Sequence, residues 1–299
     1  GLTPFQLGSL DYPLELWFAS RFAARDVDLY LDTLYSAFEM VESGITTVQH
    51  IHGWRSGPAT DWVGIANQVL QAYQDLGMRS SYCFAVRDQN HFVYEQNEAF
   101  VKKLPPEIGP EIGQILRSQE VPLADYLDFF EQLWQKWDRN QAGLTRIQLA
   151  PANLHWCSDA ALEALQAYAT QYQVGMHMHL LETPYQKVYA QRRSGKTAVQ
   201  HLHDFGLLGP HMTLGHGVWL SESDIELVAE TGTMVCHNAS SNLRLQSGIA
   251  PLNFYAKHGV IVGMGLDEAG INDDRDMLQE MRLVLKLHRV PGMDELVPT

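Results

Sequence analysis

The sequence predicts an α/β protein with a parallel sheet covered by helices. Strand-like and helix-like segments alternate along the whole chain, as in strands joined by helical crossovers. Seven strand–helix units can be counted. An open doubly wound sheet accommodates seven strands, whereas a closed (β/α)8 barrel requires eight and would lack one here. No repeat, low-complexity tract or linker divides residues 1–299, so we expect one domain.

The composition is ordinary for a soluble globular protein and argues against several partners. Hydrophobic residues make up 45% of the 299 residues and charged residues 19%. The net charge of −14 disfavours nucleic acid and anionic membrane surfaces. No apolar run is long enough to span a bilayer, and the first residues do not resemble a signal peptide. Three widely spaced cysteines suit reduced thiols, so we expect a cytoplasmic protein.

The first half of the chain supplies four of the predicted strands. Strands are expected at 45–48, 79–86, 145–150 and from Val174 onward, and helices at 26–42, 62–76, 123–137 and 158–172. Gly44 and Gly77 end the first two helices, and Ser158 or Asp159 caps the fourth. Residues 87–121 contain aromatic residues, glycines and a Pro-Pro pair, which predict an insertion or a long loop.

The second half continues the pattern. Strands are expected at 212–215, 233–236 and 260–266, helices at 196–205, 221–230, 254–258 and 277–288, and a loop at 238–251. Ser221 and Asp224 have the spacing of a capping box at the start of their helix.

The strand from Val174 carries the first candidate site residues. Side chains alternate in a strand, so His177 and His179 share a face, and Glu182 follows where the strand should become a loop. The C-terminal ends of parallel strands are where such folds build their sites. The alternative is a core strand with two hydrogen-bonded histidines and a loop carboxylate.

Parallel strands would bring further polar residues to the same end of the sheet. These residues are His50, His52, His179, His216, His237 and Asp267. Imidazoles with one carboxylate are typical ligands of Zn²⁺ or a similar ion, which lowers the pKa of a bound water. Glu182 is near enough to shuttle protons without being a ligand, and Asp267 could accept the proton of that water. The alternative is a set of satisfied polar residues, with Asp267 as a helix N-cap.

Four ordered motifs carry a resemblance to a known family. They are His179-Leu180-Leu181-Glu182-Thr183, Leu214-Gly215-His216-Gly217, Ser240-Ser241-Asn242-Leu243 with Gly248 and Pro251, and Gly263-x-Gly265-Leu266-Asp267. Together they resemble the amidohydrolase superfamily, in its branch of cytosine, guanine and adenosine-type deaminases and triazine hydrolases. The resemblance extends from about residue 24 to residue 287.

The resemblance implies a TIM-like (β/α)8 barrel, one divalent metal (Zn²⁺, or alternatively Fe²⁺) and hydrolytic deamination of an aromatic ring. It assigns His179 and Asp267 as metal ligands, with Asp267 also the general base. Glu182 would relay a proton to the leaving nitrogen, and His216 would orient or polarise the attacking water or the substrate. The family commonly forms dimers or larger assemblies, which leaves a homo-oligomer as an expectation.

The first metal motif of the family departs from its usual place. A His-x-His pair should follow strand one, before the first helix, and none is found there. His50 and His52 have the right form but follow residues 44–48, which resemble the second strand of the family. We therefore expect that this chain lacks strand one, its histidine pair and the flanking β-sandwich. The rival hypothesis makes His50 and His52 the metal pair.

Substrate contacts are expected after the third strand found here. Ala152 stands where adenosine-type deaminases carry a histidine, which argues against a nucleoside substrate. Asn153, His155 or Trp156 could contact or stack on a flat heterocycle, although a structural tryptophan is the alternative.

The other candidates lie in loops. Glu268 could pair with a ring N–H or an exocyclic amine, or cap a helix together with Asn272. Ser241 and Asn242 are expected to shape their loop rather than to do chemistry. Weaker substrate-contact candidates follow the second strand found here: Arg87, Asn90 and His91.

These patterns predict a metal-dependent hydrolase that deaminates an amino-substituted N-heterocycle such as a pyrimidine, purine, pterin or triazine and releases ammonia. The expected partner is a small heterocyclic molecule, with no nucleic acid and no membrane. Two alternatives stay open: a chlorohydrolase or cyclic-amide hydrolase of the same superfamily, and a non-catalytic remnant that only binds.

Overall fold

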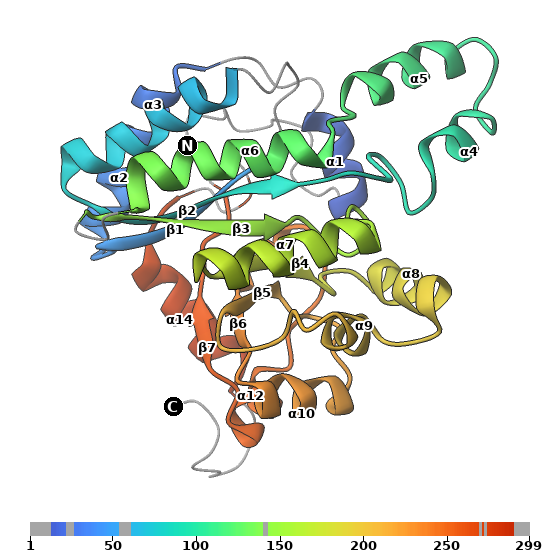
Figure 1. The fold of residues 1–299 in the computed structure, drawn as a ribbon. Helices are drawn as coiled ribbons and strands as arrows, with labels where there is room; N and C mark the ends of the chain where they lie inside the picture. Colours follow the sequence, from blue (N-terminus) through green and yellow to red (C-terminus); the bar gives the residue numbers. More distant parts are fainter. Residues whose placement is uncertain are drawn as a thin grey trace. The chain divides into compact units, whose positions relative to one another are not determined.

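Strands that follow one another in the chain are also neighbours in a seven-stranded parallel sheet (Figure 1). The strands are β1 Thr47–His52, β2 Arg79–Val86, β3 Thr145–Pro151, β4 Met176–Leu180, β5 Met212–His216, β6 Met234–His237 and β7 Val262–Met264. This sequential order is that of a (β/α) barrel, because the order of a doubly wound sheet reverses at a switch point. The predicted α/β class and parallel sheet are confirmed.

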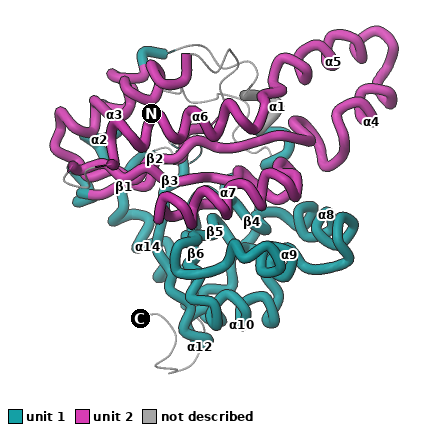
Figure 2. Tube along the Cα trace, viewed as in Figure 1, with its two compact units in different colours: residues 1–28, 35–46, 178–299 teal, residues 29–34, 47–177 magenta. Residues whose placement is uncertain are grey.

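A computed structural model describes residues 13–21, 27–53, 61–139, 143–268, 271 and 274–289. The chain divides into two compact units (Figure 2). Unit 1 is drawn from residues 1–28, 35–46 and 178–299, and unit 2 from residues 29–34 and 47–177. The division falls within β4, so unit 2 holds β1–β3 and unit 1 holds β5–β7. That the chain forms one domain stays a prediction.

The elements of unit 2 mostly match their predicted bounds. Its helices are α3 Trp62–Leu76, α4 Asn97–Val101, α5 Gly109–Ser118, α6 Leu123–Leu133, a π-helical turn Trp134–Asp138 and α7 Asp159–Tyr172. Helix α3 ends at Gly77, which has a φ of 74°, a left-handed conformation that glycine adopts without strain. Ser158 caps α7 by accepting a hydrogen bond from the Ala161 N–H.

Residues 87–121 were predicted to be an insertion or a long loop, and the loop was wrong in part, since α4 and α5 lie within this segment. Pro110 occupies the first turn of α5, where the missing N–H has no intrahelical partner to lose. The Pro-Pro pair that predicted a loop, Pro105 and Pro106, lies in the turn between α4 and α5.

An aromatic cluster holds β2 against α3 and α6, both of which pack on it. The Trp62 ring lies 4.7 Å from Phe84, 5.0 Å from Tyr126 and 5.6 Å from Phe129, measured between centroids. Trp62 is fully buried, and rings at these separations contribute beyond the area that they bury. The cluster fixes the strand that precedes the segment of Arg87 and His91.

Unit 1 contains more helices than the sequence predicted. Its helices are α1 Leu14–Arg21, α8 Pro184–Ser194, α9 Ala198–Asp204, α10 Glu222–Thr231, α11 Ala239–Arg244, α12 Leu252–His258 and α14 Met277–Leu287, and helix α2 Leu29–Glu42 crosses the boundary between the units. The predictions had no helix for α1, α8 or α11. Helix α8 is polar on most sides, so it gives no 3.6-residue pattern. The capping box of Ser221 and Asp224 is confirmed.

Strands β1 and β7 differ most from their predicted bounds. Strand β1 covers 47–52 rather than 45–48, so His50 and His52 lie within the strand, paired in register with Tyr82 and Phe84. Strand β7 is shorter than the predicted 260–266 and ends at Met264, which leaves Asp267 on the segment after it.

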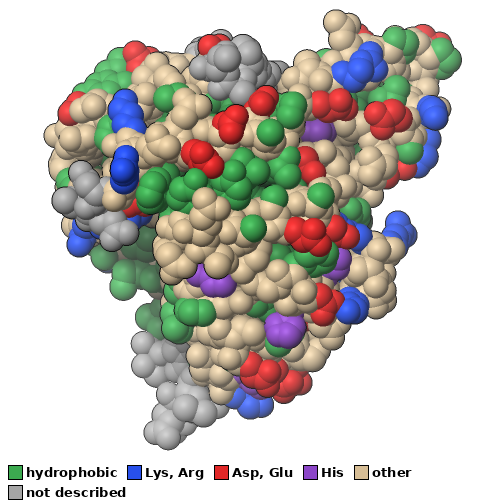
Figure 3. Space-filling model, viewed as in Figure 1, with side chains coloured by type: hydrophobic (Ala, Val, Ile, Leu, Met, Phe, Trp, Pro, Cys, Tyr) green, Lys and Arg blue, Asp and Glu red, His purple; other side chains and the backbone are tan. Residues whose placement is uncertain are grey.

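The described residues add three facts about the chain as a whole. The three cysteines are free thiols, as predicted. No helix among these residues combines the length and apolarity needed to cross a bilayer. On the face shown in Figure 3, acidic side chains are spread over the surface, and Lys and Arg side chains lie in small separate groups.

Gly265, between β7 and Asp267, should tolerate no side chain. A Cβ there would lie 2.2 Å from Asn238 Oδ1 and 2.8 Å from Cys236 Sγ. Gly265→Ala is expected to lower the free energy of unfolding by about 1–3 kcal/mol, as overpacking does. Gly64→Ala, on the exposed side of α3 with nothing within 4 Å, should instead raise it by about 0.5 kcal/mol. Denaturant titration of both variants tests this, and equal effects would contradict it.

Candidate active site

Three residues with left-handed backbone mark the strand ends of unit 1. Leu181 follows β4 with a φ of 51°, His216 ends β5 with a φ of 69°, and Asp267 follows β7 with a φ of 58°. Left-handed conformations are uncommon for residues other than glycine and cluster at functional sites. These turns redirect the backbone where each strand ends, and they place the His216 and Asp267 side chains.

Backbone hydrogen bonds connect the ends of β4 and β5. The Gly217 N–H donates to the Leu180 carbonyl at 3.1 Å, and the Trp219 N–H donates to the Leu181 carbonyl at 2.9 Å. The Tyr255 hydroxyl donates to the Gly217 carbonyl, and a Cβ on Gly217 would lie 2.8 Å from that hydroxyl. The absence of a side chain at Gly217 therefore lets the Tyr255 hydroxyl reach the backbone after β5.

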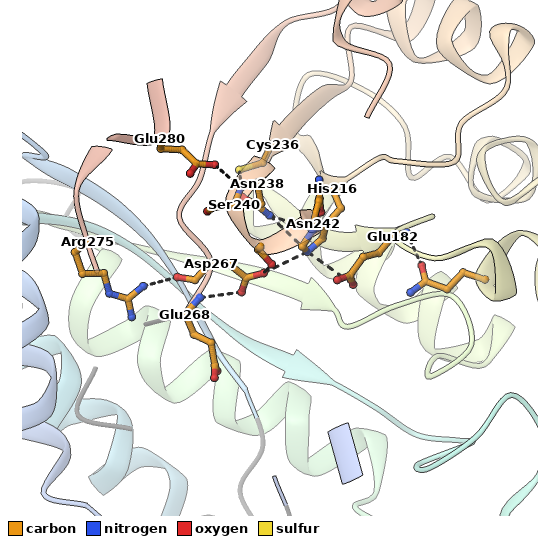
Figure 4. A network of polar contacts seen from close by, with 12 residues as sticks. Glu182, His216, Cys236, Asn238, Ser240, Asn242, Asp267, Glu268, Arg275 and Glu280 are labelled. Carbon is orange, nitrogen blue, oxygen red and sulfur yellow. Dashed lines mark hydrogen bonds and ion pairs between the residues drawn. The ribbon is translucent and has the colours of Figure 1, made fainter. Parts of the chain in front are cut away.

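The structure brings three of the predicted site residues, Glu182, Asp267 and His179, together around His216, and Figure 4 shows the two carboxylates beside its ring. Its Nε2 lies 3.8 Å from Glu182 Oε2 and 3.7 Å from Asp267 Oδ2. The His179 ring stacks on the His216 ring, with centroids 5.5 Å apart and an interplanar angle of 27°. On the other side, His216 Nδ1 lies 2.8 Å from Asn242 Oδ1. His216 is 1% exposed, so these neighbours replace water around its ring.

Hydrogen bonds fix the orientation of the Asp267 carboxylate. The Ser241 hydroxyl donates to Oδ2 at 2.7 Å, and the Glu268 N–H donates to Oδ1 at 2.9 Å. The Arg275 guanidinium donates to the Asp267 carbonyl. Both carboxylate oxygens are thus held while Oδ2 faces His216.

Burial and the neighbouring charges shift the pKa values of Glu182 and His216. Burial raises the pKa of the Glu182 carboxyl to about 7, against the opposing effect of His216 and with the support of Asp267 and Glu15. Burial lowers the pKa of His216, but the carboxylates of Glu182 and Asp267 outweigh it and raise that pKa above its usual value. A carboxyl group that titrates near neutrality can both accept and return a proton.

The same group contains side chains of the types that bind metal ions. Imidazole and carboxylate, as in His179 and Asp267, are suitable donors for zinc. Within the described part of the chain, however, no three His, Cys, Asp or Glu side chains are grouped as a metal site. These residues do not complete a ligand set.

Other predicted site residues belong to unit 2. His50 Nδ1 is hydrogen-bonded to the Tyr73 hydroxyl at 2.8 Å, and the His50 and His52 rings stack with centroids 5.8 Å apart. Asn153 is buried. Trp156 lies under the Arg87 guanidinium at 3.9 Å and against His155 at 4.3 Å. These packing contacts fit the structural alternative for Trp156, and a substrate role for it stays a prediction.

Two other candidates in unit 1 make contacts of their own. His237 pairs with His288 at the end of α14, with 3.0 Å between their Nε2 atoms, and burial lowers the pKa of His237 to about 4. The Glu268 side chain points away from His216 (Figure 4), and a substrate contact for it stays a prediction. Asn272 lies outside the described residues.

Sequence reasoning missed the residues that support the group. Asn238 Nδ2 lies 3.4 Å from His216 Nδ1, and Glu280 on α14 accepts a hydrogen bond from the Ser240 N–H at 3.1 Å. Glu280 is 2% exposed, and an acidic residue on the buried face of a helix is a signal that could have found it.

The model of the amidohydrolase family matches residues 6–297. The chain belongs to the amidohydrolase family. The resemblance read from the four motifs is confirmed.

Curated relatives within the family are deaminases. The chain is 29% identical over 293 residues to 5-methylthioadenosine/S-adenosylhomocysteine deaminase of Syntrophomonas wolfei, covering 96% of this chain and 58% of that protein. It is 36% identical over 154 residues to 5'-deoxyadenosine deaminase of Methanosarcina mazei, covering 52% of this chain and 36% of that protein. This amidohydrolase chain thus spans about three fifths of the length of relatives that it matches throughout.

Solved structures share the fold. Atrazine chlorohydrolase of Arthrobacter aurescens, complexed with zinc, matches with a TM-score of 0.79 at 21% identity, covering 95% of this chain and 61% of that one. Adenosine deaminase of Xanthomonas campestris with bound zinc matches with a TM-score of 0.74 at 22% identity, covering 93% and 56%. At these identities the similarity establishes the amidohydrolase fold and no more.

Glu182→Gln should stabilise the metal-free protein at alkaline pH. The folded-state pKa of about 7 lies above the unfolded value of about 4.3, so between them the folded state binds the extra proton and stability falls as pH rises. The variant cannot ionise there. We compare the free energy of unfolding of the variant with that of the wild type at two pH values, by denaturant titration with a chelator present. The advantage of the variant should be about 2–3 kcal/mol larger at pH 8 than at pH 4.5.

Glu163→Gln, on the exposed side of α7, is the control and should show no such pH dependence. A Glu182→Gln variant that parallels the wild type at both pH values would contradict the assigned burial of this carboxyl group.

Proposed function

We propose that the protein is a metal-dependent hydrolase that removes an amino group from an N-heterocycle, such as a pyrimidine, purine, pterin or triazine, and releases ammonia. The observation that carries this proposal is the buried Glu182 carboxyl, with a pKa of about 7, placed 3.8 Å from His216 and beside Asp267. Family membership and the deaminase names of the relatives support it.

The chain's own residues can carry the proton transfers of such a reaction. Asp267, with Oδ2 oriented by Ser241, accepts a proton from the attacking water. The water oxygen forms the new bond to the ring carbon, and Glu182 delivers a proton to the amino nitrogen as the carbon–nitrogen bond breaks. His216 Nε2 faces both carboxylates and hydrogen-bonds the water or the substrate. Ammonia leaves, and the ring carbon keeps the oxygen.

A divalent metal completes the proposal. When bound, such an ion acidifies water and polarises the ring. His179 and Asp267 would hold it. We propose Zn²⁺, with Fe²⁺ as the alternative that the same ligand types suit. Zinc in two structures of the same fold supports this choice.

The choice of ring is set by residues other than the proton carriers. Ala152 is buried and stands where adenosine-type deaminases carry a histidine, so we infer a ring preference unlike theirs even though the curated relatives are named for nucleosides. A departing chloride needs no proton, whereas a departing amine does, so the Glu182 carboxyl favours deamination over the chlorohydrolase alternative. A cyclic-amide hydrolase could also use it, to protonate the nitrogen of the bond that opens. A homo-oligomer and a cytoplasmic location stay predictions.

Glu182→Gln should abolish most of the activity while it keeps the fold. Losing a positioned proton carrier lowers kcat by about 10²–10⁴-fold. The assay is ammonia release from a panel of aminopyrimidines, purine bases and nucleosides, pterins and triazines, with chloride release and ring absorbance followed in parallel. Glu163→Gln serves as the control. Unchanged turnover in Glu182→Gln, or chloride release without ammonia, would refute the proposal.

Metal binding should depend on His179. The Zn²⁺ affinity of the wild type, stripped with a chelator, is measured by titration against a chromophoric competitor. His179→Ala should weaken that affinity by at least about tenfold, since a removed ligand costs no less than a removed supporting residue. His203→Ala, exposed on α9, is the control. Equal affinities of His179→Ala and wild type would exclude His179 as a ligand.

A further inference from the structure

Three consecutive residues of α11 contact three different parts of unit 1, and Figure 4 labels the first and the third of them, Ser240 and Asn242. We call Ser240–Asn242 the clip. The backbone N–H of Ser240 donates to Glu280 Oε1 on α14, at 3.1 Å. The hydroxyl of Ser241 donates to Asp267 Oδ2 after β7, at 2.7 Å. The side-chain oxygen Oδ1 of Asn242 lies 2.8 Å from Nδ1 of His216 at the end of β5. Both side chains that reach the candidate site are fully buried, so water does not compete for these bonds.

The third contact determines which nitrogen of His216 carries the proton of the neutral ring. An amide oxygen can only accept a hydrogen bond, so Nδ1 of His216 is the donor in its 2.8 Å contact with Asn242 Oδ1. The amide nitrogen of Asn238 lies 3.4 Å from Nδ1 and 3.5 Å from Nε2, and with Nδ1 protonated it can donate only to Nε2. The neutral ring then presents the lone pair of Nε2, the atom that lies 3.7 Å from Asp267 and 3.8 Å from Glu182. In the opposite tautomer the Nδ1 lone pair would face the amide oxygen, and Nε2 could no longer accept.

The Asn242 side chain has no other role among the described residues. Its Nδ2 is buried without a hydrogen-bond partner there. An unsatisfied buried amide N–H costs about 1–3 kcal/mol. The side chain is thus poorly suited as general structural support, and its oxygen serves the His216 ring.

We propose that Asn242 is a positioning residue that holds His216 in the Nδ1–H tautomer, while Ser241 holds Asp267, so that the clip sets two proton-handling groups of the site from one short helix. This inference rests on the proposed function and deepens it. The proposed role requires neither the Ser241 nor the Asn242 side chain to touch the substrate. Removing either side chain should therefore reduce kcat more than it raises KM.

The tautomer can be measured without any activity. In metal-free protein labelled with ¹⁵N-histidine, the His216 signal is assigned by its loss in His216→Gln, at a pH where the ring is neutral. The wild type should show the Nδ1–H tautomer, the one that a free imidazole side chain disfavours. Asn242→Leu should shift the ring toward Nε2–H. Asn242→Asp should keep Nδ1–H, because its carboxylate oxygen still accepts.

Asn253→Leu is the matched control. Asn253 lies on α12 in the same unit and donates one hydrogen bond, to the His288 carbonyl. Its loss removes a comparable contact and should leave the His216 tautomer unchanged. Thermal unfolding of all variants shows whether each one is folded.

Kinetics complete the test. Asn242→Leu should lower kcat by about 10–100-fold, as the loss of supporting residues does, with KM changed less than about threefold, and Asn242→Asp should recover most of kcat. An Nε2–H tautomer in the wild type, or an unchanged tautomer in Asn242→Leu, overturns the inference even if ammonia is released. The expected tautomers without turnover of any ring by the wild type would refute the proposed function alone.

Discussion

The candidate site depends on the exclusion of water from one imidazole, His216, which lies between two carboxyl groups and an amide. His216 is 1% exposed, with Asn242 on one side of its ring and Glu182 and Asp267 on the other. Without water, each of these groups sets the protonation of the next. The left-handed turn at His216, the glycine after it and the hydrogen bonds to β4 all serve to hold the ring there.

Excluding water from these groups lowers the stability of the fold, and under the proposed function it supports proton transfer. Burying the Glu182 carboxyl and placing Leu181, His216 and Asp267 in left-handed backbone are unfavourable for folding. The hydrogen bonds from Ser241 and to Glu280 offset part of that cost and keep the groups in place. Under the proposed function, the same groups would move a proton to a leaving nitrogen.

Local signals predicted the parts of this structure that local sequence controls. Gly77 ends α3 where expected, Arg79–Val86 forms β2 as predicted, and the motifs named Glu182, His216 and Asp267. The contacts of Asn242 and Glu280 could not be predicted, because they join residues 26 and 40 positions apart by hydrogen bonds that leave no periodic pattern. Helix α8 was not predicted, because its residues are polar on most sides and give no helical pattern of apolar residues.

The most direct test of hydrolytic deamination is turnover in water enriched in oxygen-18. The account predicts that each released ammonia is matched by one oxygen-18 atom on the ring carbon that carried the amine, detected by mass spectrometry of the product. Ammonia released without labelled product, or labelled product that keeps its amino group, would contradict the assignment of this site to water-dependent removal of a ring amine.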